Sequence, residues 1–156
     1  SEMLGLIQDM DHFHEWVHGA LKASVIKKIS ETEQACYYVN KVPILKNRDG
    51  VIVQSVSQDP DSLVVSVTLS SQPKLVKRKP QFARITHLAG VWQLRPLGNK
   101  QVELTYQLHL DPGGMIPDQI VNFMLKATPY NTLVNLGKQL KRKRYANLQV
   151  PHIQEP

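Results

Sequence analysis

The sequence has little cysteine, few aromatic residues and no long apolar run. Cys36 is the only cysteine among 156 residues, which excludes an internal disulfide and a cysteine-based metal site. No stretch approaches the roughly 18 consecutive apolar residues that a membrane-spanning helix needs. Residues 1–4 lack the basic-then-apolar layout of a signal peptide. Because unpaired cysteine suits a reducing compartment, we expect a cytoplasmic protein.

The rest of the composition is that of one globular domain. Hydrophobic residues make up 42% and charged residues 21% of the chain, and a chain of this length can bury a core of its own. There is no internal repeat and no low-complexity tract. The sequence therefore predicts one domain over residues 1–147 and an extended or disordered tail over residues 148–156.

The net charge of +6 is concentrated in two basic clusters. They consist of Lys74, Lys77, Arg78 and Lys79, and of Lys141, Arg142, Lys143 and Arg144. The simplest interpretation is a solvated loop and a solvated helix end. The functional alternatives are attraction to an anionic membrane surface or to nucleic acid. Neither cluster is interleaved with aromatic residues, which argues against single-stranded nucleic acid. We expect no nucleic-acid partner, and transient contact of residues 141–144 with an anionic membrane is the functional alternative that stays open.

Three histidines near the N-terminus include one metal-like pattern. His14, Glu15 and His18 match the letters His-Glu-x-x-His, which zinc peptidases carry on a helix. Such a site also needs a third ligand and an open cleft, and no spacing marks a third ligand elsewhere in the chain. We therefore expect a surface helix here, with no metal and no cofactor.

The middle of the chain alternates between apolar and polar residues with a period of two, as strands do. The expected strands cover residues 25–31, 34–42, 51–58, 63–69, 83–95 and 101–110. The clearest is 101–110, where one face is apolar: it carries Val102, Leu104, Tyr106, Leu108 and Leu110. Hairpin-length links between these strands predict an antiparallel sheet.

A long apolar helix is expected after the last strand, over residues 117–144 with an interruption at Pro129. Its predicted apolar face comprises Ile116, Ile120, Phe123, Met124, Ala127, Val134 and Gly137, widened by Leu125, Leu133, Leu136 and Leu140. A helix this apolar must cover something, and the sheet is available. The sequence thus predicts the α+β class, with the helix on one face of the sheet.

Several short motifs in a fixed order resemble the START (StAR-related lipid-transfer) domain in its bacterial single-domain form. They span about residues 10–141 and read Tyr37-Tyr38-Val39-x-x-x-Pro43, Asn47-Arg48-Asp49-Gly50-Val51, Gly90-Val91-Trp92-x-Leu94-x-Pro96-Leu97-Gly98, Tyr106, Asp111-Pro112-Gly113-Gly114-x-Ile116-Pro117, Asn122 and Thr128-Pro129-Tyr130-x-Thr132-Leu133. Each motif alone is weak, and their shared order makes the resemblance specific.

The resemblance implies a helix-grip fold, in which a curved antiparallel sheet wraps around the long C-terminal helix and encloses a hydrophobic tunnel. It also implies binding of one lipid or sterol-like molecule, with transfer between membranes and no chemistry. START domains begin with a helix and three strands that we expect to be missing here. One sheet edge would then be bare, which predicts pairing with another chain.

The candidate ligand-binding residues come from the apolar faces of the helix and the sheet. They are Leu69, Arg84, Trp92, Leu104, Tyr106, Leu108, Ile120, Phe123, Met124 and Ala127. Plain core packing is the alternative for the apolar members. Arg84 either points inward, where it needs an anionic partner or ligand head group, or lies at a strand end in solvent. Arg48 and Asp49 are expected to stabilise a turn.

Two further functions stay open. The first is an enzyme of the cyclase or hydrolase type on the same fold, which needs a titratable group in the cavity; Tyr106 is the candidate. The second is a sensor whose ligand occupancy alters partner binding.

The two glycines at 113 and 114 suggest a hinge, so alanine at both positions is expected to slow ligand exchange.

Overall fold

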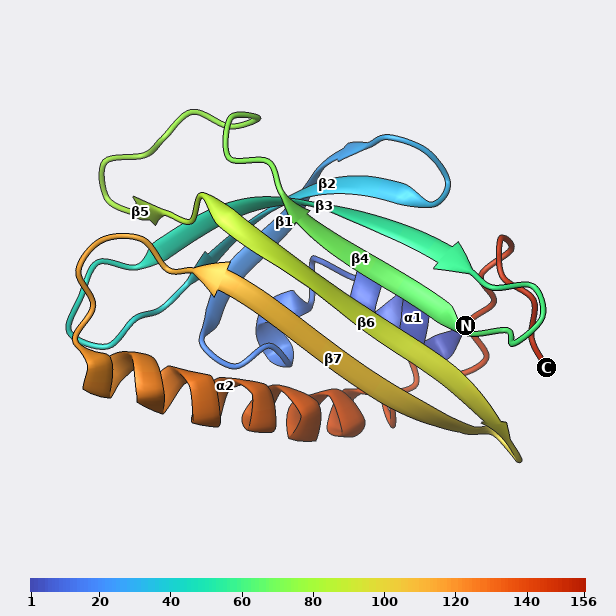
Figure 1. Ribbon diagram of the computed structural model, residues 1–156. Helices are drawn as coiled ribbons and strands as arrows, with labels where there is room; N and C mark the ends of the chain where they lie inside the picture. Colours follow the sequence, from blue (N-terminus) through green and yellow to red (C-terminus); the bar gives the residue numbers. More distant parts are fainter.

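The computed structural model describes residues 1–156, except for the side chain of Phe123. The chain begins with helix α1 (Glu2–Gln8) and a short 3-10 turn (Phe13–Glu15), and helix α2 (Asp118–Gln139) follows the last strand (Figure 1). The described residues form seven strands between them: β1 (Ala20–Lys28), β2 (Glu33–Asn40), β3 (Arg48–Gln58), β4 (Val65–Ser71), β5 (Ala83–Arg84), β6 (His87–Gly98) and β7 (Gln101–Asp111).

The strands form one sheet in the order β1-β2-β3-β4-β6-β7, with antiparallel neighbours throughout. The two-residue strand β5 lies off this path and pairs in parallel with β3. The expected antiparallel sheet and C-terminal helix are confirmed. The expected single strand over residues 83–95 is wrong, because the chain leaves β3 after Arg84 and starts a new strand at His87.

The main core lies between α1, the sheet and the C-terminal end of α2. Leu4, Leu6 and Ile7 of α1 are at most 1% exposed, because this short helix directs them against the sheet. Trp16 packs edge-on against Trp92 of β6, with ring centroids 5.9 Å apart. A second helix expected around these residues is only the 3-10 turn at Phe13–Glu15, and β1 begins at Ala20.

Helix α2 ends at Gln139, five residues before the expected end, and passes through Pro129 without a break. One stripe of less exposed residues runs along the helix at spacings of three to four, with two adjacent members in its middle: Ile120, Met124, Ala127, Thr128, Thr132, Leu136 and Gln139. Leu125, Leu133 and Val134 were expected on the apolar face but are 68%, 41% and 40% exposed. They lie outside the stripe of less exposed residues, because successive residues are rotated by about 100° around the helix axis. Neither helix of the described chain is long and apolar enough to cross a membrane.

The last residues of the chain return to the sheet. Val150 and Ile153 pack against the main core. Gln58 at the end of β3 and Gln154 exchange two hydrogen bonds of 2.8 Å, one from the Gln58 Nε2 and one from the Gln154 backbone N–H. The segment expected to be an extended or disordered tail therefore covers one end of the sheet, next to α1.

Candidate hydrophobic ligand site

The inner face of β6 and β7 forms an apolar surface that is only partly covered. Directly opposed residues on this face include Leu94 and Leu104, Trp92 and Tyr106, and Gly90 and Leu108. Trp92 is buried and stacks on Tyr106, with ring centroids 3.6 Å apart. On this face of β7, exposure is lowest in the middle of the strand: Leu104 and Tyr106 are half-buried, whereas Val102 is 42%, Leu108 is 41% and Leu110 is 36% exposed. The apolar face is therefore least covered at the two ends of β7.

Gly90 allows two of the candidate residues to meet at the centre of this face. A Cβ atom at Gly90 would lie 3.0 Å from Leu108 Cδ1 and 3.4 Å from Leu69 Cδ1. Leu69 of β4 is 8% exposed and belongs to the main core. A shallow depression of about 380 Å³ also lies over residues 89–91 and 107–109. The absence of a side chain at Gly90 thus leaves the room on the inner face that the side chains of Leu69 and Leu108 occupy.

The C-terminal end of helix α2 packs against the main core on the inner side of the sheet. Leu136 is 3% exposed and lies in the main core, and Leu140 packs against that core. The candidate residues Ile120, Met124 and Ala127 come from the first half of the helix and are half-buried. Phe123, the remaining helix candidate, has a side chain outside the described residues. In Figure 1, this first half of α2 is the end that lies toward the loops below β5.

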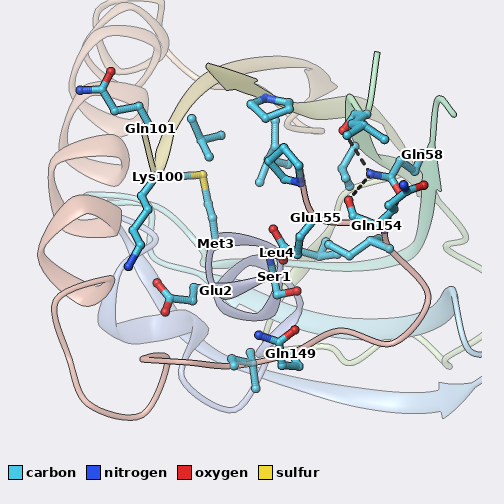
Figure 2. A pocket seen from close by; sticks show the side chains of 18 of the residues that line it. Ser1, Glu2, Met3, Leu4, Gln58, Lys100, Gln101, Gln149, Gln154 and Glu155 are labelled. Carbon is cyan, nitrogen blue, oxygen red and sulfur yellow. Dashed lines mark hydrogen bonds and ion pairs between the residues drawn. The ribbon is translucent and has the colours of Figure 1, made fainter. Parts of the chain in front are cut away.

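A larger cavity of about 620 Å³ lies at the opposite end of the apolar face (Figure 2). It is lined by the start of α1, the β6–β7 turn, the residues at the end of α2 and the C-terminal segment, and it is open to solvent on one side. Its apolar lining includes Met3, Leu94, Val102, Leu140 and Leu148. Its volume lies within the usual range of ligand pockets. Leu94 and Val102 also belong to the inner face of β6 and β7, so the cavity is continuous with that face.

This cavity was not expected from the sequence. Its walls come from residues 1–4, 58–65, 94–102 and 140–156, and no local pattern connects segments so far apart in the chain. The one available signal was the period-two pattern of the last strand, which places Val102 on the same face as Leu104. Residues 148–156 were expected to form an extended or disordered tail, so the sequence did not predict that they line this cavity.

The guanidinium of Arg84 forms hydrogen bonds to the Asp49 carboxylate and to neighbouring backbone carbonyl groups. Its side chain and that of Asp49 are each 1% exposed, and Arg84 Nη2 lies 2.7 Å from Asp49 Oδ2. Arg84 Nε donates to Asp49 Oδ1 at 2.8 Å. The remaining N–H groups donate to the backbone carbonyls of Pro73, Val76 and Lys77. All five donors of the guanidinium are used, so Arg84 has none left for a ligand head group, and it is not solvated either.

Arg48 was expected in a turn with Asp49, but both residues begin β3. Arg48 donates to the carbonyls of Pro112 at 3.2 Å and Gly113 at 3.1 Å, and also to the carbonyl of Lys46. It therefore holds together the loop before β3 and the loop before α2. Gly113 and Gly114 have φ values of 66° and 70°, in the left-handed region that favours glycine.

The remaining titratable candidates do not form an obvious catalytic group. Burial raises the pKa of the Tyr106 hydroxyl to about 12, so it keeps its proton at neutral pH. Glu15 of the His-Glu-x-x-His pattern accepts hydrogen bonds from Arg142 at 2.6 Å and Arg144 at 3.2 Å. Among the described residues, no group of three His, Cys, Asp or Glu side chains is placed to hold a metal ion.

Comparison with known proteins places this geometry in a family. The family model of the START domain matches residues 2–144. A Pseudomonas aeruginosa protein described only as uncharacterized is 25% identical over 138 residues, which are 88% of this chain and 68% of that protein. Human START domain-containing protein 10 is 22% identical over 150 residues, and the match spans 51% of its length. The chain thus covers about half of this human relative.

Solved structures share the same fold. The STAR-related lipid transfer protein of Xanthomonas axonopodis superposes with a TM-score of 0.82 at 28% identity, covering 90% of this chain and 78% of that one. An aromatase/cyclase of Streptomyces is more distant, with a TM-score of 0.51 at 15% identity over 88% of this chain and 84% of that one. The second likeness concerns the fold alone.

Proposed function

The chain belongs to the START domain family, and we propose that it binds one lipid or other hydrophobic molecule between the inner face of its sheet and α2. The observation that carries this proposal is the uncovered apolar face of β7, where Leu108 and Leu110 are 41% and 36% exposed. Apolar side chains left in water favour an occupant that covers them. The related Xanthomonas protein is described as a lipid transfer protein, which supports a lipid as that occupant.

The proposed contacts are the apolar candidates on the two facing surfaces. They are Leu69, Trp92, Leu104, Tyr106, Leu108, Ile120, Met124 and Ala127. Met124 suits a flexible ligand, because its unbranched thioether side chain adapts to irregular shapes. Arg84 is left out, since its donors are occupied by Asp49 and backbone carbonyls. Phe123 stays a candidate from the sequence alone.

Transfer of the ligand between membranes is the role we favour over catalysis. The cavity candidate for acid–base work was Tyr106, and its raised pKa makes it a poor proton acceptor near neutral pH. A sensor function needs the same ligand site, so ligand binding is the step to test first. Transfer and sensing then differ in whether the protein carries lipid from donor to acceptor vesicles.

The first experiment is native mass spectrometry of the protein purified from cells. We expect a mass increase that corresponds to one bound hydrophobic molecule and that organic extraction removes. The extracted molecule then serves as the probe for affinity measurements. A protein that carries no adduct and takes up none from mixed lipid extracts would contradict the proposal.

The second experiment compares two exposed leucines that lie on different surfaces. Leu108→Gln places an amide on the inner face of β7, and Leu125→Gln places one on the outer face of α2, where Leu125 is 68% exposed. We expect about fivefold weaker binding of the extracted ligand for Leu108→Gln, because apolar contact is lost. Leu125→Gln should bind as the wild type does. Equal affinities for all three proteins would place the ligand elsewhere.

A further inference from the structure

The cavity at the α1 end of the sheet has an apolar floor and a polar rim (Figure 2). Its floor includes Leu4, Val65 and Leu94, which are buried in the main core. Six further lining residues carry a carboxamide, and all but the first are exposed at the rim: Gln58, Asn99, Gln101, Asn147, Gln149 and Gln154. An apolar lining with a few polar groups that orient the ligand is the usual form of a small-molecule pocket.

Most of these carboxamides are available to a ligand. Gln58 is the exception, because its amide exchanges two hydrogen bonds with the backbone of Gln154. Asn147 bonds to Glu2 through its backbone N–H. Within the described part of the chain, the side chains of Asn147, Gln154 and the three other rim residues form no hydrogen bond with the protein. Each carboxamide offers two donor hydrogens and an acceptor oxygen, so the rim matches hydroxyl groups, which also donate and accept.

The charged side chains of the lining favour neither a cationic nor an anionic ligand. Glu2 Oε1 accepts the Asn147 backbone N–H at 2.7 Å, and Glu155 is paired with the amino group of Ser1. Both carboxylates therefore have a partner that a cationic head group would have to displace. The third charged lining residue, Lys100, is exposed in the β6–β7 turn, and an anionic head group would meet it together with the two carboxylates. A neutral head group avoids both penalties.

Four of the five non-glycine residues with positive φ in the described chain line this cavity: Leu63, Asn99, Lys100 and Asn147. Asn99 and Lys100 form the two-residue turn between β6 and β7, where positive φ at both positions is expected. Leu63 has a φ of 57°, which is uncommon for leucine and energetically unfavourable. Strained backbone of this kind clusters at ligand-binding positions, which supports a site here.

The wall made by the C-terminal segment is held in one specific position. Leu148 packs so closely against Gly5 of α1 that a Cβ atom at residue 5 would lie 1.9 Å from Leu148 Cδ2. Glycine in the interior of a helix is unfavourable compared with alanine, and the contact with Leu148 gives a reason for it at this position. Ile153 of the same segment packs against the main core. The shape of the cavity is therefore fixed by packing between α1 and the C-terminal segment.

We propose that this cavity is a second binding site, which takes a small amphiphile with an uncharged, hydroxyl-bearing head group and a short apolar chain. The chain lies against Leu94 and Val102, and the hydroxyl groups bond to carboxamides at the rim. The inference goes beyond the proposed function, because the cavity lining includes none of the residues proposed above to contact the lipid. Since Leu94 and Val102 also belong to the inner face of the sheet, the two sites are adjacent and need separate tests.

The first test compares three amphiphiles with the same chain and different head groups: monodecanoylglycerol, decanoate and decyltrimethylammonium. Each is titrated into isotope-labelled protein below its critical micelle concentration, and NMR follows the side-chain amide signals of asparagine and glutamine. We expect saturable binding of monodecanoylglycerol with shifts of the rim signals, and about tenfold weaker binding of the two ions, which lose hydration without gaining a free counter-charge. Equal or tighter binding of an ion would overturn the proposed ligand class, and the absence of any saturable shift at the rim would overturn the site.

The second test removes carboxamides from the rim. In Asn147→Gly/Gln149→Ala, glycine keeps the positive φ at residue 147, and two partners of the head group are lost. We expect about tenfold weaker binding of monodecanoylglycerol, since each lost hydrogen bond weakens binding a few-fold. Gln93→Ala/Gln107→Ala is the matched control, because both glutamines are exposed on β6 and β7 outside the cavity, and it should bind as the wild type does. Equal affinities of the two variants would overturn the proposed role of the rim.

A matched pair of substitutions on β7 separates this site from the lipid site. Val102 and Leu108 are 42% and 41% exposed on the same face, but only Val102 lines the cavity. Val102→Gln should weaken binding of monodecanoylglycerol about fivefold and retain the co-purified lipid, whereas Leu108→Gln should do the reverse. If both variants weaken both ligands equally, the ligands share one site, which overturns the second site and leaves the proposed function standing. If the protein never carries lipid and Val102→Gln alone weakens monodecanoylglycerol, the proposed function is contradicted and the second site is supported.

Discussion

At the residue scale, Asp49 connects three parts of the chain. Its carboxylate accepts from Arg84 through both oxygens and from the Tyr37 hydroxyl at 3.1 Å. Arg84 in turn donates to the carbonyls of Pro73 and Val76 in the loop between β4 and β5. The pattern of residues indicated that an inward Arg84 would need an anionic partner. It could not identify Asp49, because the two residues are 35 positions apart and β5 was not foreseen.

Replacing Asp49 by asparagine should destabilise the protein strongly. The substitution leaves the Arg84 guanidinium buried without a counter-charge, and removal of one partner of a buried pair costs about 3–5 kcal/mol. Urea unfolding at neutral pH measures the loss. Glu103→Gln is the matched control, because its pair with Arg95 is 3.6 Å long with both side chains more than half exposed. That control should change the free energy of unfolding by less than about 1 kcal/mol.

The same carboxylate predicts the pH dependence of stability. Burial acts to raise the pKa of Asp49, but the hydrogen bonds from Arg84 and Tyr37 outweigh it and hold the pKa below its ordinary value of 3.8. A depressed folded-state pKa stabilises the fold above the unfolded-state value and loses this effect as pH falls through the folded-state value. The difference in free energy of unfolding between wild type and Asp49→Asn should therefore be constant near neutral pH and shrink below about pH 4. If this difference in the free energy of unfolding stays constant down to the pH at which the protein unfolds in acid, Asp49 is not the source of the pH dependence.

At the scale of elements, most of the fold could be predicted because its signals are local. Period-two alternation located the sheet strands, and three-to-four spacing located α2. The boundaries that were wrong depend on distant contacts. The chain between residues 83 and 95 has no local sign of a break, and its first two residues leave to pair with β3. The basic residues 141–144 suit a helix C-terminus, yet α2 ends at Gln139, and Arg142 and Arg144 bond to Glu15.

The loop before α2 gives a prediction for ligand exchange. Gly113 and Gly114 have positive φ values, and a Cβ atom at Gly113 would lie 3.3 Å from the Arg84 carbonyl oxygen. Alanine at both positions should therefore disfavour the observed loop by about 1–2 kcal/mol for each residue. We expect this loosening to speed ligand exchange, the opposite of the direction expected from glycine flexibility alone. Stopped-flow release of a fluorescent fatty acid measures the rate, and slower release would restore the hinge interpretation.

At the scale of the whole molecule, the site is harder to predict than the fold. The apolar face of β7 could be foreseen from alternation, and the three-to-four spacing picked out Ile120, Met124 and Ala127 on α2, which are half-buried. The distance between the inner face of the sheet and α2 depends on the contacts that hold α2 in place. That anchoring rests on Leu136, the return of the C-terminal segment and the α1 contacts, which combine residues from both ends of the chain.

The two edges of the sheet differ in how open they are to another strand. On β1, register shifts occur between Ala20 and Lys22 and between Val25 and Lys27, and the strand carries Lys22, Lys27 and Lys28. Bulges and lysines are features that block edge pairing. β7 runs for 11 residues without lysine or proline, and its register with β6 is regular from His87 to Pro96. If this chain associates with a second copy, β7 is the edge that the structure favours.

Sedimentation velocity at rising protein concentration tests this association. We expect a growing dimer fraction for the wild type and a smaller one for Thr105→Lys/Gln107→Lys, because two copies paired along β7 would bring like charges together. Both positions are exposed on β7, so the fold should tolerate the change. Ser24→Lys/Val25→Lys on β1 is the control, since that edge already carries lysines and bulges, and it should dimerise as the wild type does. A wild type that stays monomeric throughout, or a control that loses the dimer instead, would contradict pairing through β7.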